Sequence, residues 1–187
     1  MTHLKTWMAA VLLACAPLAA VAAAPAPDGF AATFVETRTL PGFEQALTSH
    51  GVLRFSRDGG FHWEITKPYH YVFDMADGTA REVLPDGTRR VLKPEQTPWL
   101  KAVQRIFVSA LSGDHTQLTR YFHVQAKPLD QGRHVTLTPK PGAMAKVVKR
   151  IEVTESAPGR PRHLMVEQAS GGRMDIRFTP IDADGSS

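Results

Sequence analysis

A cation and several large apolar side chains lie close together on either side of the turn Asp58-Gly59-Gly60. The sequence alternates before and after this turn, which predicts two strands whose every second residue faces the same side. Arg57 then shares a sheet face with apolar residues of both strands, namely Leu53, Phe55, Phe61, Trp63 and Ile65. An arginine at the edge of an apolar, aromatic surface suits a ligand with apolar tails and a polar head.

The eight histidines of the chain do not have the spacing of metal ligands. A turn separates His62 from His70, and a helix end and a strand start separate His115 from His123. None forms a helical pair or a local cluster with carboxylates, so surface or interface histidines are favoured over a metal centre. We predict neither a metal nor another cofactor.

Catalytic patterns are equally weak. Ser112, Asp114 and His115 have the residue types of a triad, but neighbours in sequence cannot hold its geometry, and no Gly-x-Ser-x-Gly motif occurs. No glycine-rich phosphate loop follows a strand, and no carboxylate is expected on an otherwise apolar strand face. We therefore predict no catalytic residues and a protein that is not an enzyme; a secreted hydrolase of acyl or glycan substrates is the weaker alternative.

The N-terminus resembles an export signal. Lys5 precedes the apolar stretch 7–14, and Val21-Ala22-Ala23 fits a signal peptidase site. We expect a signal peptide over 1–23, an extended leader over 24–29, one domain over 30–180 and a disordered tail over 181–187. Cys15, the only cysteine, also ends a possible lipobox, but the residues after it stay apolar, which favours a soluble exported form. In that form the mature chain has no cysteine.

The formal net charge of +4 comes from lysines and arginines spread along the chain. This weakly favours anionic membrane surfaces or acidic partners. The sequence has no basic stripe with aromatic stacking platforms, so we predict no nucleic-acid binding.

Period-two patterns and turn signals divide most of the chain into strands. The turns are marked by 58–60, 77–78 and 86–87, which contain glycines suited to tight hairpins. A single amphipathic helix is expected after the N-cap Thr97, ending at Gly113. The eleven predicted strands are 30–38, 51–57, 61–66, 70–75, 79–84, 88–93, 122–129, 134–139, 147–154, 162–167 and 173–179.

Eleven strands with short links predict an antiparallel meander, and one helix cannot cover all of its apolar faces. Such a sheet must stack into a sandwich or curl around its apolar side. We predict a mainly β fold, a curled antiparallel sheet that forms an incomplete barrel with a helical lid over an apolar cavity. The predicted lid residues are Trp99, Val103, Ile106, Phe107 and Leu111. The predicted cavity residues are Phe34, Leu53, Phe55, Phe61, Trp63, Ile65, Leu137, Ile176 and Phe178.

In order and spacing, several short motifs resemble the outer-membrane lipoprotein carrier family (LolA-like) of Gram-negative periplasm. They are Phe34, Gly51-x-Leu53-x-Phe55-x-Arg57, Phe61-x-Trp63, Pro68, Asp77-Gly78, the central helix and Leu137-Thr138-Pro139-Lys140. The resemblance implies an incomplete barrel with a helical lid, a lid-contacting arginine at Arg57 and a cavity tryptophan at Trp63.

The resemblance also implies a function. A periplasmic carrier of this family takes acylated lipoproteins from an inner-membrane ABC exporter and passes them to an outer-membrane acceptor. We expect such a carrier, acting as a monomer on an acylated lipoprotein or lipid cargo. Two alternatives remain open: an outer-membrane acceptor acylated at Cys15, or a carrier of another envelope lipid.

Overall fold

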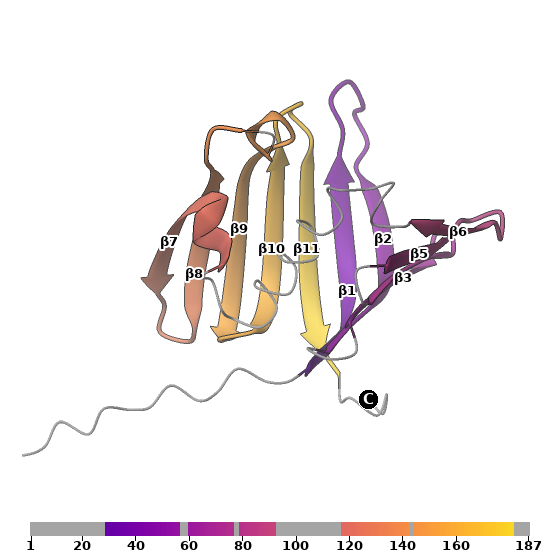
Figure 1. Ribbon diagram of the computed structural model, residues 1–187, viewed down its shortest axis with the longest axis horizontal. Coiled ribbons are helices and arrows are strands. Elements are labelled where there is room, and N and C mark those ends of the chain that lie inside the picture. Colours follow the sequence, from indigo (N-terminus) through magenta and orange to yellow (C-terminus); the bar gives the residue numbers. More distant parts are fainter. Residues whose placement is uncertain (1–28, 57–59, 77–78, 93–116, 143, 182–187) are drawn as a thin grey trace, which may run out of the picture.

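The computed structural model describes residues 29–56, 60–76, 79–92, 117–142 and 144–181. These residues form one antiparallel sheet of eleven strands (Figure 1). The strands are β1 (Gly29–Thr39), β2 (Leu47–Ser56), β3 (Gly60–Lys67), β4 (Tyr71–Ala76), β5 (Thr79–Val83), β6 (Arg89–Leu92), β7 (Phe122–Pro128), β8 (Arg133–Pro139), β9 (Val148–Ala157), β10 (Arg160–Gln168) and β11 (Arg173–Pro180). Two short 3₁₀ helices accompany them, η1 (Gln117–Arg120) and η2 (Met144–Lys146).

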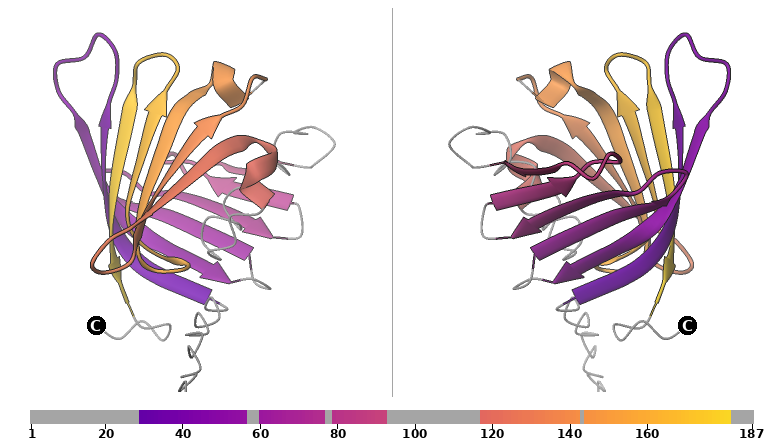
Figure 2. Two further views of the ribbon diagram at one scale, coloured as in Figure 1. Left: turned by 90° about the vertical axis from the view of Figure 1, so that its left-hand side faces the viewer. Right: turned by 90° about the vertical axis from the view of Figure 1, so that its right-hand side faces the viewer.

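The sheet is a meander with one long-range join. Its order is β6-β5-β4-β3-β2-β1-β11-β10-β9-β8-β7, so the first and last strands of the chain pair at its centre. β6 and β7 form the two edges, and the sheet curls strongly without closing (Figure 2). The prediction of a mainly β, incomplete antiparallel barrel is confirmed. Arg57 and the predicted lid helix with Trp99, Val103, Ile106, Phe107 and Leu111 lie outside the described residues.

Each predicted strand is present, with its ends shifted by a few residues. The largest shift is in β2, which begins at Leu47 because it pairs with β1 from there onward (Leu47 opposite Arg38). After Leu47 come the polar residues Thr48, Ser49 and His50, so this part of the strand shows no apolar alternation that could reveal it. Gly60 and Gly87 adopt the positive φ angles, 88° and 84°, that tight turns favour.

Strand parity turns most apolar side chains to the concave face. The larger buried cluster comes from β1 to β5 and β11, and a smaller one from η1 and β7 to β9. Leu164 on β10 packs against both clusters, so the two form one continuous apolar layer. No helix of the described residues has the length and apolarity needed to cross a membrane.

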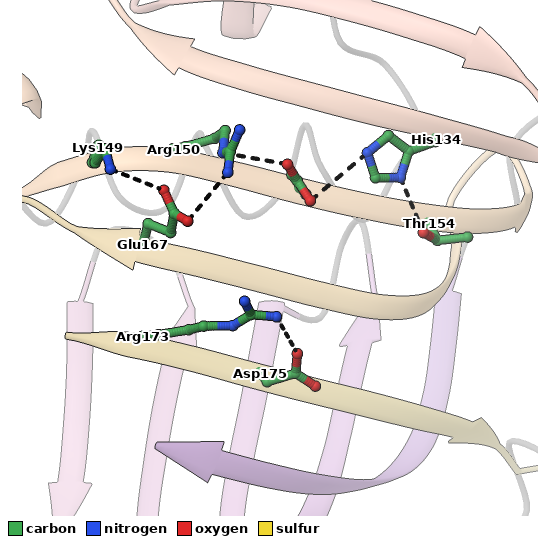
Figure 3. Close-up of polar contacts among 8 residues, drawn as sticks. His134, Lys149, Arg150, Thr154, Glu167, Arg173 and Asp175 are labelled. Carbon is green, nitrogen blue, oxygen red and sulfur yellow. Dashed lines mark hydrogen bonds and ion pairs between the residues drawn. The ribbon is translucent and has the colours of Figure 1, made fainter. Parts of the chain in front are cut away.

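On the convex side, charged side chains of β9, β10 and β11 form pairs (Figure 3). Arg150 and Lys149 both contact the carboxylate of Glu167, at 3.2 and 3.6 Å. Burial by itself raises the pKa of Asp175, but the side chains of His163 and Arg173 outweigh it and hold the pKa below its ordinary value. Basic side chains here lie beside acidic ones, so the positive charge of the chain does not gather into one patch on these strands.

Histidines of this face pair with carboxylates across strands. Nδ1 of His62 lies 2.6 Å from Asp74, and Nε2 of His70 lies 3.0 Å from Glu64, which also contacts His62 at 3.7 Å. The sequence alone did not reveal this proximity, because only the antiparallel pairing of β3 with β4 places His62 beside Asp74. In the part of the chain that the structure describes, no group of three or more His, Cys, Asp or Glu side chains could hold a metal ion.

Candidate functional site

The concave face contains a cavity of about 530 Å³. Its walls come from β1, β3, β4, β10 and β11, with Tyr69 and Pro85 contributed by two turns at the same end of the sheet. The lining is mainly apolar and aromatic: Glu36, Arg38, Phe61, Trp63, Ile65, Tyr69, Tyr71, Phe73, Pro85, Leu164, Met174 and Ile176.

Stacked aromatic rings form the wall on β3. The indole of Trp63 stacks on Phe34, with ring centroids 4.0 Å apart and planes inclined by 26°, and lies 6.2 Å from Phe61. Phe61 in turn meets Phe73 edge-on at 6.3 Å. Strand register produces this arrangement, because Trp63 lies opposite Phe73 while Phe34 lies opposite Gly51, which has no side chain. The ring of Phe34 occupies the space that a Gly51 side chain would need.

The predicted cavity residues fall into three groups in the structure. Phe61, Trp63, Ile65 and Ile176 line the cavity. Leu137 belongs to the smaller apolar cluster. Four others are buried in the larger cluster on the same face: Phe34, Leu53, Phe55 and Phe178.

Sequence reasoning missed part of the lining. Tyr71 and Phe73 alternate on β4, a signal that could have added them to the site. Met174 alternates with the predicted Ile176 on β11 and could have been added by the same signal, whereas Leu164 could be assigned only once the pairing of β10 with β11 was known. The hydroxyl of Tyr71 donates to Glu82 at 3.3 Å. Burial, followed by the charge of Glu82 and this hydrogen bond, raises the pKa of Tyr71 to about 12.

Two carboxylates lie on the apolar concave face, so the expectation that none would do so is wrong. The side chain of Glu36 is only 4% exposed, and Arg38 donates to its Oε1 from Nη2 at 2.6 Å and from Nε at 3.0 Å. Glu155 is fully buried and accepts from Nε of Arg133 at 2.6 Å. Both follow the alternation of their strands, and the adjacent guanidinium groups offset the cost of burying their charges.

A second, smaller hollow of about 200 Å³ adjoins the first. The two hollows share Glu36, Arg38 and Tyr69 as lining residues, so the Glu36–Arg38 ion pair lies at their common boundary. The remaining lining of the smaller hollow is Ala46, Leu47, Thr48, Ser49 and Pro68. An apolar hollow with a polar boundary can hold a hydrocarbon chain and contact its head group.

Residues 27–186 match the family described as outer membrane lipoprotein carrier protein LolA. The chain belongs to this family. A relative of this LolA-family chain, an outer-membrane lipoprotein carrier protein from Chromohalobacter salexigens, is 29% identical over 146 residues. The match covers 77% of this chain but only 65% of the relative, slightly less than two thirds of its length.

Matches among solved structures include a LolA superfamily protein from Nitrosomonas europaea, with 12% identity and a TM-score of 0.40. That similarity covers 81% of this chain and 84% of the other. A DUF1329 family protein from Desulfovibrio piger has 14% identity and a TM-score of 0.42, with coverage of 86% and 88%.

Proposed function

We propose that this LolA-family protein is a carrier that shields the acyl chains of lipoproteins, or of similar lipid-tailed molecules, and delivers them towards the outer membrane. The observation that carries the proposal is the aromatic-walled cavity on the concave face. Family membership and the carrier relative support the same role. The proposal involves no catalytic step.

The energetics of acyl chains favour a cavity of this kind. Each CH₂ group kept out of water contributes about 0.8 kcal/mol, so a chain in aqueous solution needs an apolar enclosure. At about 30 Å³ for a water-sized group, the cavity of about 530 Å³ holds roughly 18 such groups. This corresponds to about one long acyl chain, and further chains of a cargo would lie along the rest of the concave face.

A carrier must also release what it binds. Trp63, Tyr71 and Phe73 are only partly buried although they pack against the larger cluster. Their remaining apolar surface is available to a ligand and is not committed to a closed core. An open sheet with such a wall can exchange a chain without unfolding.

The other parts of the proposal come from family resemblance. We infer that the protein acts in the periplasm as a monomer, receives cargo from an inner-membrane ABC exporter and passes it to an outer-membrane acceptor. Arg57 is proposed to control a lid formed by the helix that carries Trp99, Val103, Ile106, Phe107 and Leu111.

Mass spectrometry of protein purified from periplasm tests the proposal. The wild-type protein should carry acylated peptides or lipids, and Phe73→Lys should reduce this cargo at least tenfold by placing a charge in the cavity. Glu82, opposite Phe73 in the sheet, gives the new lysine a partner and helps the variant fold. Val35→Lys, on the exposed convex side of β1, is the matched control and should keep its cargo. Absence of acylated cargo from the wild type, or full cargo on Phe73→Lys, would contradict the proposal.

A further inference from the structure

We propose that the Glu36–Arg38 ion pair binds the head of the cargo through its neutral ester and amide groups, while an acyl chain occupies the adjoining cavity. This inference rests on the proposed carrier function. It assigns a recognition role to two residues at the polar end of the predicted strand 30–38, to which no sequence pattern gave a function.

Position is the first argument. Glu36 and Arg38 line both the large apolar cavity and the smaller hollow, so a molecule that extends from one to the other must pass them. The smaller hollow also contains the hydroxyl-bearing residues Thr48 and Ser49. An acyl chain in the large cavity would therefore place its first polar atoms beside the ion pair.

The second argument is the hydrogen-bonding capacity that Arg38 retains. Its Nε and Nη2 both donate to Oε1 of Glu36, and Nη2 also lies 3.6 Å from the sulfur of Met174. These contacts fix the plane of the guanidinium group. Among the described residues no partner is found for Nη1, whose two N–H groups can donate to a ligand. The Arg38 side chain is 42% exposed, so these donors can be reached.

Charge defines the class of head group. Glu36 and Arg38 are the charged residues among those that line the two hollows, and their charges cancel. A phosphate would have to compete with Glu36 for Arg38 and would be repelled by the buried carboxylate. A carbonyl oxygen of an ester or amide accepts a hydrogen bond from Nη1 without disturbing the pair. The site therefore fits a neutral acylglyceryl or acyl-amide head better than an anionic phospholipid.

Binding of three fluorescent probes with the same chain length tests this assignment: a neutral diacylglycerol, a phosphatidylglycerol and a hydrocarbon without polar groups. The double variant Glu36→Gln, Arg38→Leu leaves no unpaired buried charge and should fold. It should bind the diacylglycerol probe about tenfold more weakly than wild type and the hydrocarbon probe equally well. Arg177→Leu, which removes an exposed arginine of β11 on the convex side, is the matched control and should change neither.

The single variant Glu36→Gln adds a second test, because it leaves the charge of Arg38 uncompensated. Its preference should shift towards phosphatidylglycerol. Equal binding of diacylglycerol by wild type and the double variant, or tighter wild-type binding of phosphatidylglycerol than of diacylglycerol, would overturn the assignment. Failure of wild type to bind even the hydrocarbon probe would instead refute the proposed carrier function on which it rests.

Discussion

At the scale of single residues, the concave face combines aromatic rings with two ion pairs. Trp63 stacks between Phe34 and Phe61, which fixes the orientation of its indole. Glu36 and Glu155 remain in the same apolar layer because Arg38 and Arg133 donate to them at 2.6 Å. A buried carboxylate that loses such a partner costs several kcal/mol, so both arginines are expected to contribute to stability as well as to local shape.

Arg57→Leu is expected to separate loading of cargo from its release. On the predicted strand, Arg57 lies at the end of the apolar face, where its guanidinium group can hydrogen-bond lid carbonyls or a cargo head group. Such bonds contribute about 1–3 kcal/mol each, and leucine keeps the apolar contact without them. The closed, empty state should lose stability relative to the loaded one, so cargo should enter but leave slowly.

A two-step transfer assay that scores loading and unloading separately measures this effect, with a thermal melt as the folding control. Normal unloading by the variant would identify Arg57 as an ordinary strand-end residue.

Tyr71 should make stability depend on alkaline pH. Its pKa is about 12 in the folded protein against an ordinary value of 10.0, so its contribution is complete below about pH 10 and is lost as pH rises towards 12. At neutral pH, Tyr71→Phe should be destabilised by about 1 kcal/mol because the hydrogen bond to Glu82 is lost. Between pH 10 and 12 this difference should shrink or reverse.

Chemical denaturation of wild type, Tyr71→Phe and the control Tyr121→Phe across this pH range tests the prediction. A wild-type to Tyr71→Phe difference that stays constant with pH would contradict it.

At the scale of secondary-structure elements, the join between β1 and β11 organises the site. It places Phe34 opposite Phe178 and Glu36 opposite Ile176, so residues from the two ends of the domain form one wall. On the other side of β1, Gly51 of β2 leaves room for the ring of Phe34. The three strands β1, β2 and β3 therefore depend on one glycine for their close packing.

Gly51→Ala should destabilise this part of the sheet. A methyl group at residue 51 would overlap the carbonyl oxygen of Glu64 on β3 and the ring of Phe34, so a backbone and a side chain must both move. Overpacking of this kind costs roughly 1–3 kcal/mol, and a displaced Phe34 would disturb the stack on Trp63. The midpoint of urea unfolding and the tryptophan fluorescence should both change, whereas the exposed Thr48→Ala on the same strand should leave them unaltered.

At the scale of the whole molecule, the sheet is curved and open, and its two edges β6 and β7 are not paired with each other. Most buried apolar side chains lie on the concave side, while the convex side carries paired charges around the buried Met165. This division suits a protein that binds apolar material inside while presenting a charged exterior. The proposed signal peptide and most of the proposed leader and tail lie outside the described residues, but Gly29 of the leader already belongs to β1, and the backbone N–H of Ile181 in the tail donates to the carbonyl oxygen of Ala31 at 3.0 Å.

We predict that the mature protein lacks Cys15. The apolar run of the N-terminal segment continues past this residue to the Val21-Ala22-Ala23 site, where cleavage is expected after Ala23. The intact mass of the protein isolated from the native envelope should therefore match a chain that begins at Ala24. A mass that corresponds to a diacylglyceryl-modified Cys15 would favour the outer-membrane acceptor alternative.

The sequence by itself determined the elements and their apolar faces. Period-two alternation is a local property, so the eleven strands and the shared face of Phe61, Trp63 and Ile65 could be assigned without tertiary information. The turn glycines Gly60 and Gly87 were likewise identified from local chemistry.

Only the tertiary structure decided which strands meet and how deep each side chain lies. The pairing of β1 with β11 joins residues as far apart as Ala32 and Pro180, and no local pattern specifies that register. The curvature of the sheet then separates the apolar face into a buried core around Phe34 and Leu53 and a cavity lined by Trp63 and Tyr71. Burial of Glu36 depends on the same pairing, because its neighbours come from β2 and β11 as well as from its own strand.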